Sequence, residues 1–426
     1  MSNLFAGWPK DRLGQVYTAY MPPSTEVCDN YFHFPPREHY KPSQYRAMRI
    51  LGWDGRSPLQ QSRSVAVMQT ASRSRPGMAK LYSHMSALPD LSPVRSTRQM
   101  EEWVEDFRPD LIYSMLGSIR MTRIAALVAR TCNVPIVPHF TDDWAATLYD
   151  SGQLFGRANR AMQAGIHDII SMSPLGMVIS SPMAKEYEKR YGIPFFPFMN
   201  CADETYFSTA AAKIEPESEI RLAYVGALHL NRWKSLLDIG VCLGELDRSG
   251  VKTRLVIHSP QRDLDAYGCH FAGIPQVQLG PSLESWQVPH ALHSASVLVH
   301  VESFDEEIRR YTHYSISTKI PQYLAAARPI LGYGPSEVAS INHIREAQAG
   351  LTVGVSDRSQ LLRALAELCS DSRLRAQLGQ NGAAFARREH AKESVAFRFA
   401  ATLRSAMDPQ KAVSNGGQGA AKGGAA

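Results

Sequence analysis

Hydrophobic and polar positions form two kinds of pattern between residues 110 and 200, short apolar runs and longer amphipathic stretches. Residues 118–133 and 183–192 space their apolar side chains as a helix does. The short apolar runs predict strands over 110–115, 134–140, 167–173, 176–181 and 195–200. Strands that alternate with helices are typical of a parallel sheet covered on both faces, so this region is predicted to be α/β.

The same pattern begins again after a polar stretch at residues 204–218, which we take as a linker. The predicted strands of this second series are 220–228, 253–259, 275–280, 295–301, 329–334 and 350–355. Two such series indicate two Rossmann-like domains, in which ligands bind beyond the carboxyl ends of the strands. We therefore expect the functional site in a cleft between the domains. The chain has no G-x-G-x-x-G motif, which disfavours a nicotinamide-dependent dehydrogenase.

Residues 317–335 predict a helix that leads directly into a buried strand. Ser317 or Thr318 can cap the first turn of this helix. Lys319 and Gln322 are three positions apart and therefore share one helix face. That face is either solvated or lines a ligand site, and the pattern alone does not decide between the two.

Composition places the chain among soluble globular proteins. Its 426 residues are 44% hydrophobic and 20% charged, which suggests two or three domains. The six cysteines are scattered without a C-x-x-C pair, so they are predicted to be free thiols of a reducing compartment. No apolar stretch approaches the roughly 18 residues of a membrane-spanning helix, and the first residues do not form a signal peptide. We expect a cytoplasmic protein.

The net charge of +6 is unevenly placed, because residues 40–98 hold ten Lys and Arg against two acidic residues. Interleaved aromatic and apolar side chains make residues 40–98 a candidate contact for an anionic membrane surface, which would place the protein at the inner face of the membrane. A merely basic, loop-rich insertion is the alternative. No recognition motif accompanies this charge, so nucleic acid is not an expected partner. Residues 408–426 are rich in Gly and Ala and are predicted to be disordered.

Several segments resemble the family-4 glycosyltransferases, which have the GT-B fold of two facing Rossmann-like domains. In the second half they are 224–239 (YVGALHLNRWKSLLDI), 284–301, 317–335 (STKIPQYLAAARPILGYGP) and 343–357. In the first half they are 134–144 (VPIVPHFTDDW) and 168–207, which includes the N-x-x-D of Asn200 and Asp203. The resemblance covers roughly residues 100–405. It implies a nucleotide-sugar donor and a retaining transfer that uses neither a metal ion nor a cofactor.

The resemblance implies a donor site in the second half of the chain. Its residues are Gly226, Arg232, Lys234, Glu302, Ser317, Lys319, Gln322 and Tyr323. Gly226 would let the backbone approach the donor, and cationic side chains would stabilise the charge of the leaving diphosphate. Gln322 stands where the family has a glutamate that contacts the ribose, and Glu302 is a candidate for a displaced carboxylate. Ala327 stands where a glycine usually ends the helix, at a cost of about 1 kcal/mol if the backbone there needs a positive φ.

On the acceptor side, the resemblance makes His139 the candidate catalytic residue. Asp142 and Asp143 follow in the same loop and would contact the acceptor hydroxyl or orient the sugar. A structural histidine is the alternative for His139. The Asp-Leu-Asp at 263–265 imitates a metal-binding motif of another transferase fold, but it falls in a polar loop, and we expect no metal site.

The domain limits expected from these patterns are an acceptor-binding domain over 1–205 and a nucleotide-sugar-binding domain over 219–385. A C-terminal helix over 386–407 is expected to pack back toward the first domain. The first 20 residues resemble the first helix of a GT-B domain and the strand after it, so the first strand is expected to be missing. We expect weak stability or activity from such a truncated sheet.

Three functions remain open at this point. The preferred one is a glycosyltransferase that moves a sugar from a UDP- or GDP-sugar to a glycan or lipid-linked acceptor in polysaccharide biosynthesis. The second is a catalytically weakened sugar-nucleotide-binding or scaffold subunit of such a pathway. The third is a GT-B-like epimerase, for which no acid–base constellation is visible. The sequence leaves the sugar, the base, the acceptor and the linkage open.

Overall fold

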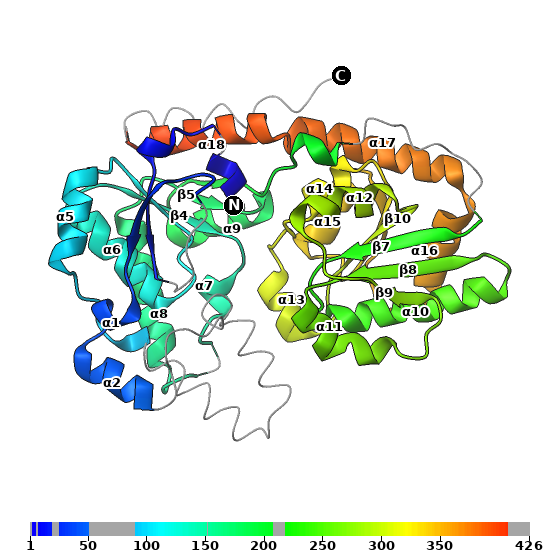
Figure 1. Cartoon of the computed structure of the whole chain (residues 1–426), viewed down its shortest axis with the longest axis horizontal. Coiled ribbons are helices and arrows are strands. Elements are labelled where there is room, and N and C mark those ends of the chain that lie inside the picture. The colour runs from blue at the N-terminus through cyan, green and yellow to red at the C-terminus, as the bar shows by residue number, and fades with distance from the viewer. Residues whose placement is uncertain are drawn as a thin grey trace. The chain divides into compact units, whose positions relative to one another are not determined.

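The computed structural model describes residues 2–5, 7–18, 25–50, 90–150, 152–207 and 218–407. The chain forms two compact units, one of residues 1–198 with 396–426 and one of residues 199–395 (Figure 1). It passes from the first unit to the second between Phe198 and Met199 and returns between Val395 and Ala396. The predicted linker residues 208–217, the tail 408–426 and most of the basic stretch, residues 51–89, lie outside the described residues.

The first unit contains a four-stranded parallel sheet in the order β3-β4-β5-β6. These strands are β3 (Ile112–Ser114), β4 (Ile136–Phe140), β5 (Gly176–Val178) and β6 (Phe195–Pro197). A second parallel pair consists of β1 (Gly14–Tyr17) and β2 (Asn30–His33). The helices are α1 (Pro36–His39), α2 (Pro42–Ile50), α5 (Arg98–Phe107), α6 (Ile119–Cys132), α7 (Trp144–Thr147), α8 (Arg157–Ser171) and α9 (Ser181–Tyr191).

Local sequence signals set the helix ends in this unit. Ser118 caps α6 by accepting a hydrogen bond from the amide of Met121, and Ser180 caps α9 in the same way. Asn133 ends α6 in a left-handed conformation, with φ of 54°. The amphipathic patterns over 118–133 and 183–192 therefore predicted these helices correctly.

Two predictions for the first unit are wrong. Residues 167–173 do not form a strand: residues 167–171 complete α8, because Ile166, Ile169 and Ile170 are buried at the i, i+3, i+4 spacing of a helix. The isoleucines are β-branched, which made a short strand look plausible. The first residues form the 3-10 turns η1 (Ser2–Phe5) and η2 (Lys10–Arg12) in place of the expected helix, and the expected strand follows as β1.

The second unit contains a six-stranded parallel sheet in the order β12-β11-β10-β7-β8-β9, of which β7 to β10 are labelled in Figure 1. Its strands are β7 (Ile220–Val225), β8 (Thr253–His258), β9 (Val277–Leu279), β10 (Val297–Val301), β11 (Ile330–Tyr333) and β12 (Gly350–Val353). Each lies within a strand predicted from the apolar runs. The strand order reverses between β7 and β10, as it does at the centre of a Rossmann sheet.

Helices surround this sheet in two packed groups. They are α10 (Arg232–Arg248), α11 (Gln261–Tyr267), α12 (Val288–His293), α13 (Glu306–Thr312), α14 (Ile320–Ala325), α15 (Ala339–Glu346), α16 (Arg358–Ser370) and α17 (Ser372–Glu389). Helix α10 packs on α16, and α14 packs on α17. The core between sheet and helices includes Leu222, Val299 and Leu331, none of which is exposed to solvent.

The helix predicted over 386–407 is divided in the structure: residues 386–389 end α17 (Ser372–Glu389), and α18 (Lys392–Met407) follows, whose residues from 396 onward belong to the first unit. Phe399 is fully buried and packs edge-on against Phe5, Tyr113 and Phe198, with ring centroids 5.0, 5.5 and 5.4 Å away. Such aromatic pairs contribute about 0.5–1.5 kcal/mol each beyond the burial of their area.

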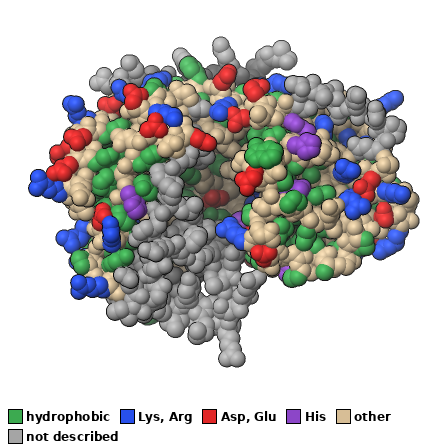
Figure 2. Space-filling model, in the orientation of Figure 1, with side chains coloured by type: hydrophobic (Ala, Val, Ile, Leu, Met, Phe, Trp, Pro, Cys, Tyr) green, Lys and Arg blue, Asp and Glu red, His purple; other side chains and the backbone are tan. Residues whose placement is uncertain are grey.

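Two compositional features are visible in the described residues. All six cysteines are free thiols. Among the helices that the structure describes, none is long and apolar enough to cross a membrane. Figure 2 shows Lys and Arg side chains interspersed with Asp and Glu on the face in view.

Candidate functional site

The candidate site lies where the strand order of the second unit reverses, at the carboxyl ends of β7 and β10. Gly226 directly follows β7, and its amide donates to the His258 carbonyl at 2.8 Å, which continues the sheet ladder. A Cβ atom on Gly226 would lie 1.8 Å from Lys319 Nζ. The missing side chain is therefore what allows the lysine to reach the end of this strand.

The Lys319 ammonium group lies against Gly226 and 5.3 Å from the ring centre of Tyr224. No hydrogen bond or ion pair joins this ammonium group to another described residue. Burial, with a smaller contribution from the charge of Arg232, lowers the pKa of Lys319 to about 7. The site thus presents an unpaired cationic group at the switch point of the sheet.

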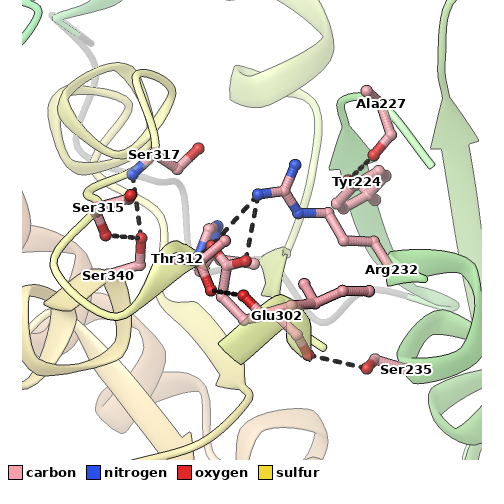
Figure 3. A network of polar contacts seen from close by, with 11 residues as sticks. Tyr224, Ala227, Arg232, Ser235, Glu302, Thr312, Ser315, Ser317 and Ser340 are labelled. Atoms are coloured by element: carbon pink, nitrogen blue, oxygen red, sulfur yellow. Dashed lines mark hydrogen bonds and ion pairs between the residues drawn. The ribbon is translucent and has the colours of Figure 1, made fainter. Parts of the chain in front are cut away.

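Arg232 and Glu302 form a buried ion pair (Figure 3), and the charges of both act on the pKa of Lys319. The Arg232 Nη2 atom lies 3.1 Å from Glu302 Oε2, and the two side chains are 14% and 2% exposed. His300 Nε2 is 3.1 Å from Glu302 Oε1, although it is not aligned for a hydrogen bond. Burial alone would raise the pKa of Glu302, but Arg232 and His300 lower it to about 2. Glu302 is therefore ionised and committed to Arg232.

Backbone contacts hold this cluster in place (Figure 3). The Ser235 hydroxyl donates to the Glu302 carbonyl at 3.0 Å, and the Tyr224 hydroxyl donates to the Ala227 carbonyl at 2.6 Å. On the other side, the Ser317 amide donates to Ser340 Oγ at 3.0 Å. The Ser317 contact fixes the turn that precedes Lys319.

Lys234 lies at the periphery of this cluster. Its ammonium group is 2.9 Å from Asp305 Oδ2, and both side chains are about half exposed. Asn231, at the start of α10, also donates to Asp305. Leu230 and Asn231 have φ values of 58° and 55°, so the loop that carries Arg232 and Lys234 holds two non-glycine residues in the left-handed region.

The helix with Lys319 differs in part from its prediction. Lys319 itself is the N-terminal boundary residue of α14, and no side chain caps the helix, so the cap expected from Ser317 or Thr318 is wrong. The Ser317 carbonyl accepts the Ile320 amide instead. Ala327 has a φ of 53°, which confirms the expectation that a backbone suited to glycine follows this helix.

Two of the predicted donor-binding residues make contacts inside the protein. The Gln322 side chain lies near the hydroxyl of Tyr206, a residue of the segment that enters the second unit, and acts to lower its pKa against the effect of burial. The Tyr323 hydroxyl bridges the end of β7: it accepts from the Val225 amide at 2.9 Å and lies 3.2 Å from the Val225 carbonyl. Tyr323 is only 1% exposed, so its hydroxyl closes the sheet ladder rather than facing a ligand.

The predicted acceptor residues lie at the carboxyl end of β4 in the first unit. His139 is fully buried, and its Nδ1 and Nε2 atoms contact the Tyr113 hydroxyl at 2.6 Å and the Phe198 carbonyl at 3.0 Å. Burial lowers the pKa of His139 to about 3. Both ring nitrogens are thus occupied by contacts inside the first unit.

The two aspartates that follow β4 differ from each other. Asp143 is 5% exposed and makes a two-pronged ion pair with Arg190, at 2.7 and 3.1 Å, and accepts the Tyr187 hydroxyl at 2.8 Å. These contacts give Asp143 a structural role in joining α7 to α9. Asp142 is more exposed and accepts the Thr141 hydroxyl at 3.2 Å, so it is the better placed of the two to meet an acceptor.

Sequence reasoning missed several residues of the site, namely Tyr224, His229, Asp263 and His300. Asp263 accepts the Leu228 amide at 2.8 Å and lies 3.5 Å from His229 Nδ1, so it holds the loop after Gly226. A signal for His300 was present, because residues two apart on a strand share a face and Glu302 had been identified. In the part of the chain that the structure describes, no cluster of three His, Cys, Asp or Glu side chains could hold a metal ion.

The sequence matches no protein-family model, and no curated protein matches it. Solved structures do match its fold. HepE from Anabaena in complex with UDP-glucose has a TM-score of 0.54 and 12% identity, covering 71% of this chain and 81% of that one. Sucrose-phosphate synthase from Thermosynechococcus elongatus has a TM-score of 0.52 and 14% identity, covering 73% and 80%.

A third structure, a UDP-forming α,α-trehalose-phosphate synthase from Burkholderia vietnamiensis, has a TM-score of 0.51 and 13% identity, covering 76% of this chain and 80% of that one. Each match spans both units of the chain and most of the other protein. The parallel sheets, the strand order and these likenesses together show that the chain has the GT-B fold of two Rossmann-like domains.

Proposed function

We propose that this protein is a glycosyltransferase that takes a sugar from a nucleotide-sugar donor, a UDP- or GDP-sugar, and passes it to a glycan or lipid-linked acceptor. The observation that carries this proposal is the unpaired Lys319 ammonium group beside Gly226, at the switch point of a Rossmann sheet. Such a position is where parallel α/β sheets bind phosphorylated ligands. A nucleoside diphosphate supplies the anionic oxygens that this cation lacks.

Proteins of the same fold support a uridine nucleotide as donor. The HepE structure holds UDP-glucose, and the trehalose-phosphate synthase is described as UDP-forming. UDP is accordingly the first nucleotide to test, with GDP as the alternative that our sequence interpretation left open.

The chemistry proposed for the site is stabilisation of the leaving diphosphate. Bond cleavage places negative charge on the phosphate oxygen that leaves the sugar, and a fixed cation in a partly buried site lowers the energy of that charge. Lys319 supplies the cation directly. Arg232 is held by its ion pair with Glu302, so it adds positive potential without losing its partner. We propose a retaining transfer without a metal ion, as the family resemblance implies.

The acceptor half of the reaction rests on fewer contacts. Asp142 is the proposed contact for the acceptor hydroxyl. We also propose that the basic residues 40–98 contact an anionic membrane surface, which would bring a lipid-linked acceptor to the enzyme in polysaccharide biosynthesis.

Binding and hydrolysis assays with UDP-glucose, UDP-N-acetylglucosamine, GDP-mannose and dTDP-glucose test the proposal. We expect one donor class to bind and to be hydrolysed or transferred, and Lys319→Ala to weaken that binding at least tenfold. Lys252→Ala is the matched control, because Lys252 is an exposed lysine of the same unit. It precedes β8 and so lies at the amino ends of the strands, opposite the candidate site. Absence of binding to any donor would overturn the proposal.

A second candidate is a nucleotide-sugar-binding subunit with weakened catalysis. It is favoured by the buried ion pair of Glu302 with Arg232, which occupies the carboxylate proposed for the ribose. Donor binding without hydrolysis or transfer to any glycan acceptor, in a folded protein, would support this candidate over the enzyme.

A further inference from the structure

One face of the sheet in the second unit carries polar side chains over β7, β8 and β9, strands that can be followed in Figure 1. Along β8 the residues alternate between buried and half-buried, whereas every residue of β10 is buried. Leu222, Leu255 and Ile257 belong to the core on the covered face. The opposite face presents Arg221, Arg254, Val256, His258 and Gln278. Parallel sheets are normally covered by apolar residues on both faces, so this polar face requires a physical reason.

Two arginines lie side by side on this face. Arg221 of β7 and Arg254 of β8 are direct partners in the register of the two parallel strands. Neighbouring strands lie about 4.8 Å apart, so the two positive side chains start close together and repel each other. The arrangement is therefore stable only if negative charge is supplied nearby.

Glu219, which precedes β7, supplies one such charge. Arg254 binds its carboxylate through Nε at 3.1 and 3.2 Å and through Nη2 at 3.0 Å, whereas Arg221 Nε stays 4.0 Å away. Lys252 adds a third positive charge that acts on Glu219. Among the residues that the structure describes, no other carboxylate forms an ion pair with either arginine. Three cations against one carboxylate leave an excess of two positive charges.

A cavity of about 320 Å³ opens over these charges. Ala223 and Val256 line it from the sheet, and Ser294 lines it from the end of α12. Gln278 of β9 also lines it, and no hydrogen bond joins the Gln278 side chain to another described residue. Pockets for small molecules have volumes of about 300–1,000 Å³, so this cavity suits a ligand of the size of a monosaccharide rather than a nucleotide.

The cavity is separate from the candidate donor site. Arg221 and Arg254 are the second residues of β7 and β8 and lie at the amino ends of these strands. Gly226 follows the carboxyl end of β7, and the extended strand between Arg221 and Gly226 spans roughly 16 Å. The charges of the cavity are therefore not explained by the binding of a sugar nucleotide at the switch point.

We propose that this cavity binds a phosphorylated monosaccharide, with its phosphate on Arg221 and Arg254 and its hydroxyls toward Gln278. A phosphate monoester carries about 1.5–2 negative charges at neutral pH, which matches the excess positive charge. The planar guanidinium group binds two phosphate oxygens at once, and an amide both donates to and accepts from sugar hydroxyls. The inference goes beyond the proposed transfer reaction and does not depend on it.

Titration calorimetry of the full chain tests the proposal with three probes, glucose 6-phosphate, mannose 6-phosphate and N-acetylglucosamine 6-phosphate. Inorganic phosphate and glucose represent the two halves of such a ligand. We expect at least one hexose phosphate to bind about tenfold or more tightly than inorganic phosphate, and glucose alone to bind most weakly. If no hexose phosphate binds more tightly than inorganic phosphate, the inference is overturned.

Arg221→Gln is the decisive variant. The Arg221 side chain is 63% exposed and 4.0 Å from its nearest carboxylate, so its replacement should leave the fold intact. We expect Arg221→Gln to weaken binding of the hexose phosphate by about tenfold or more, and Arg221→Lys to retain most of the affinity because it keeps the charge. Arg363→Gln is the matched control, since Arg363 is an exposed arginine of α16. Wild-type affinity in Arg221→Gln would contradict the proposal.

Two further measurements locate the ligand. Gln278→Ala should weaken binding of the hexose phosphate but not of inorganic phosphate, because it removes a contact with the sugar alone. An excess of UDP-glucose should leave the hexose phosphate bound, and Lys319→Ala should bind it as the wild type does. Displacement by UDP-glucose together with loss of binding in Lys319→Ala would place the phosphate in the donor site and refute the inference. Failure of every nucleotide sugar to bind would refute only the proposed function.

Discussion

Replacing Gly226 with alanine places a methyl group where the Lys319 ammonium group lies. The new Cβ atom would be 1.8 Å from Lys319 Nζ, 2.9 Å from Lys319 Cε and 3.0 Å from the Tyr224 hydroxyl. Ordinary contact distances start near 3.4 Å. Because the clashing atoms are the far end of a flexible side chain, we expect Lys319 to move and the fold to remain intact.

The expected loss of affinity for the nucleotide sugar follows from this movement of Lys319. Relief of the clash displaces Nζ by roughly 1.6 Å, which lengthens a charge-assisted contact to a phosphate oxygen from about 2.8 to about 4.4 Å. With an effective dielectric constant of about 20, the attraction weakens by about 2 kcal/mol per charge. That corresponds to a rise in Kd of up to about 30-fold, and side-chain reorientation reduces it toward about 5-fold.

The assay is titration calorimetry of Gly226→Ala with a UDP-sugar at pH 7, accompanied by chemical denaturation. Gly244→Ala is the control, because Gly244 lies within α10 and its Cβ would approach only the flexible end of Gln276, at 3.2 Å. We expect Gly244→Ala to bind as the wild type does. A Gly226→Ala variant that binds within twofold of the wild type would refute the placement of the diphosphate beside Lys319.

Three further predictions concern stability. Glu302→Gln leaves Arg232 without its buried partner and should lower the unfolding free energy by about 3 kcal/mol, measured by urea denaturation at pH 7. The folded-state pKa of Glu302 is lowered to about 2, so the stability contributed by its ionised carboxylate is present above the ordinary pKa of 4.5 and is lost as pH falls toward 2. The unfolding free energy should therefore fall less steeply with acid in Glu302→Gln than in the wild type. Ala327→Gly should raise the melting temperature, since it relieves a φ of 53° at a gain of about 1 kcal/mol, and an unchanged or lower value would count against backbone strain there. Asp143→Asn should cost about 3 kcal/mol by denaturation because it breaks the buried contact with Arg190, and a cost below 1 kcal/mol would argue against a structural Asp143.

The strands of the second unit were predictable because burial on both faces of a parallel sheet requires apolar runs. A run such as 295–301 therefore indicates a buried strand. The same reasoning failed at 167–173, where the two buried isoleucines, Ile169 and Ile170, satisfied either a strand or a helix. Only their contact with the rest of the first unit decides for the helix, since period and length are ambiguous over seven residues.

For the candidate site as well, the sequence predicted some features and left others to the tertiary structure. The residue types near Gly226 and Lys319 were identified through a family resemblance, and the positive φ at Ala327 was anticipated from the glycine that usually stands there. Neither pattern could tell whether a polar side chain already has a partner. His139 and Tyr323 are occupied by internal hydrogen bonds, whereas the described residues leave Lys319 without one.

The sequence by itself therefore determined the α/β class, the two series of strands and the helix that carries Lys319, because local periodicity and turn chemistry act within about ten residues. The tertiary structure alone decided which polar groups remain available. Lys319 and Gly226 are 93 positions apart, and only the crossing of the chain between β7 and β10 brings an amine to the end of a strand that lacks a side chain. The pairing, burial and charge of Lys319 depend on this contact between distant segments, and no local sequence pattern encodes them.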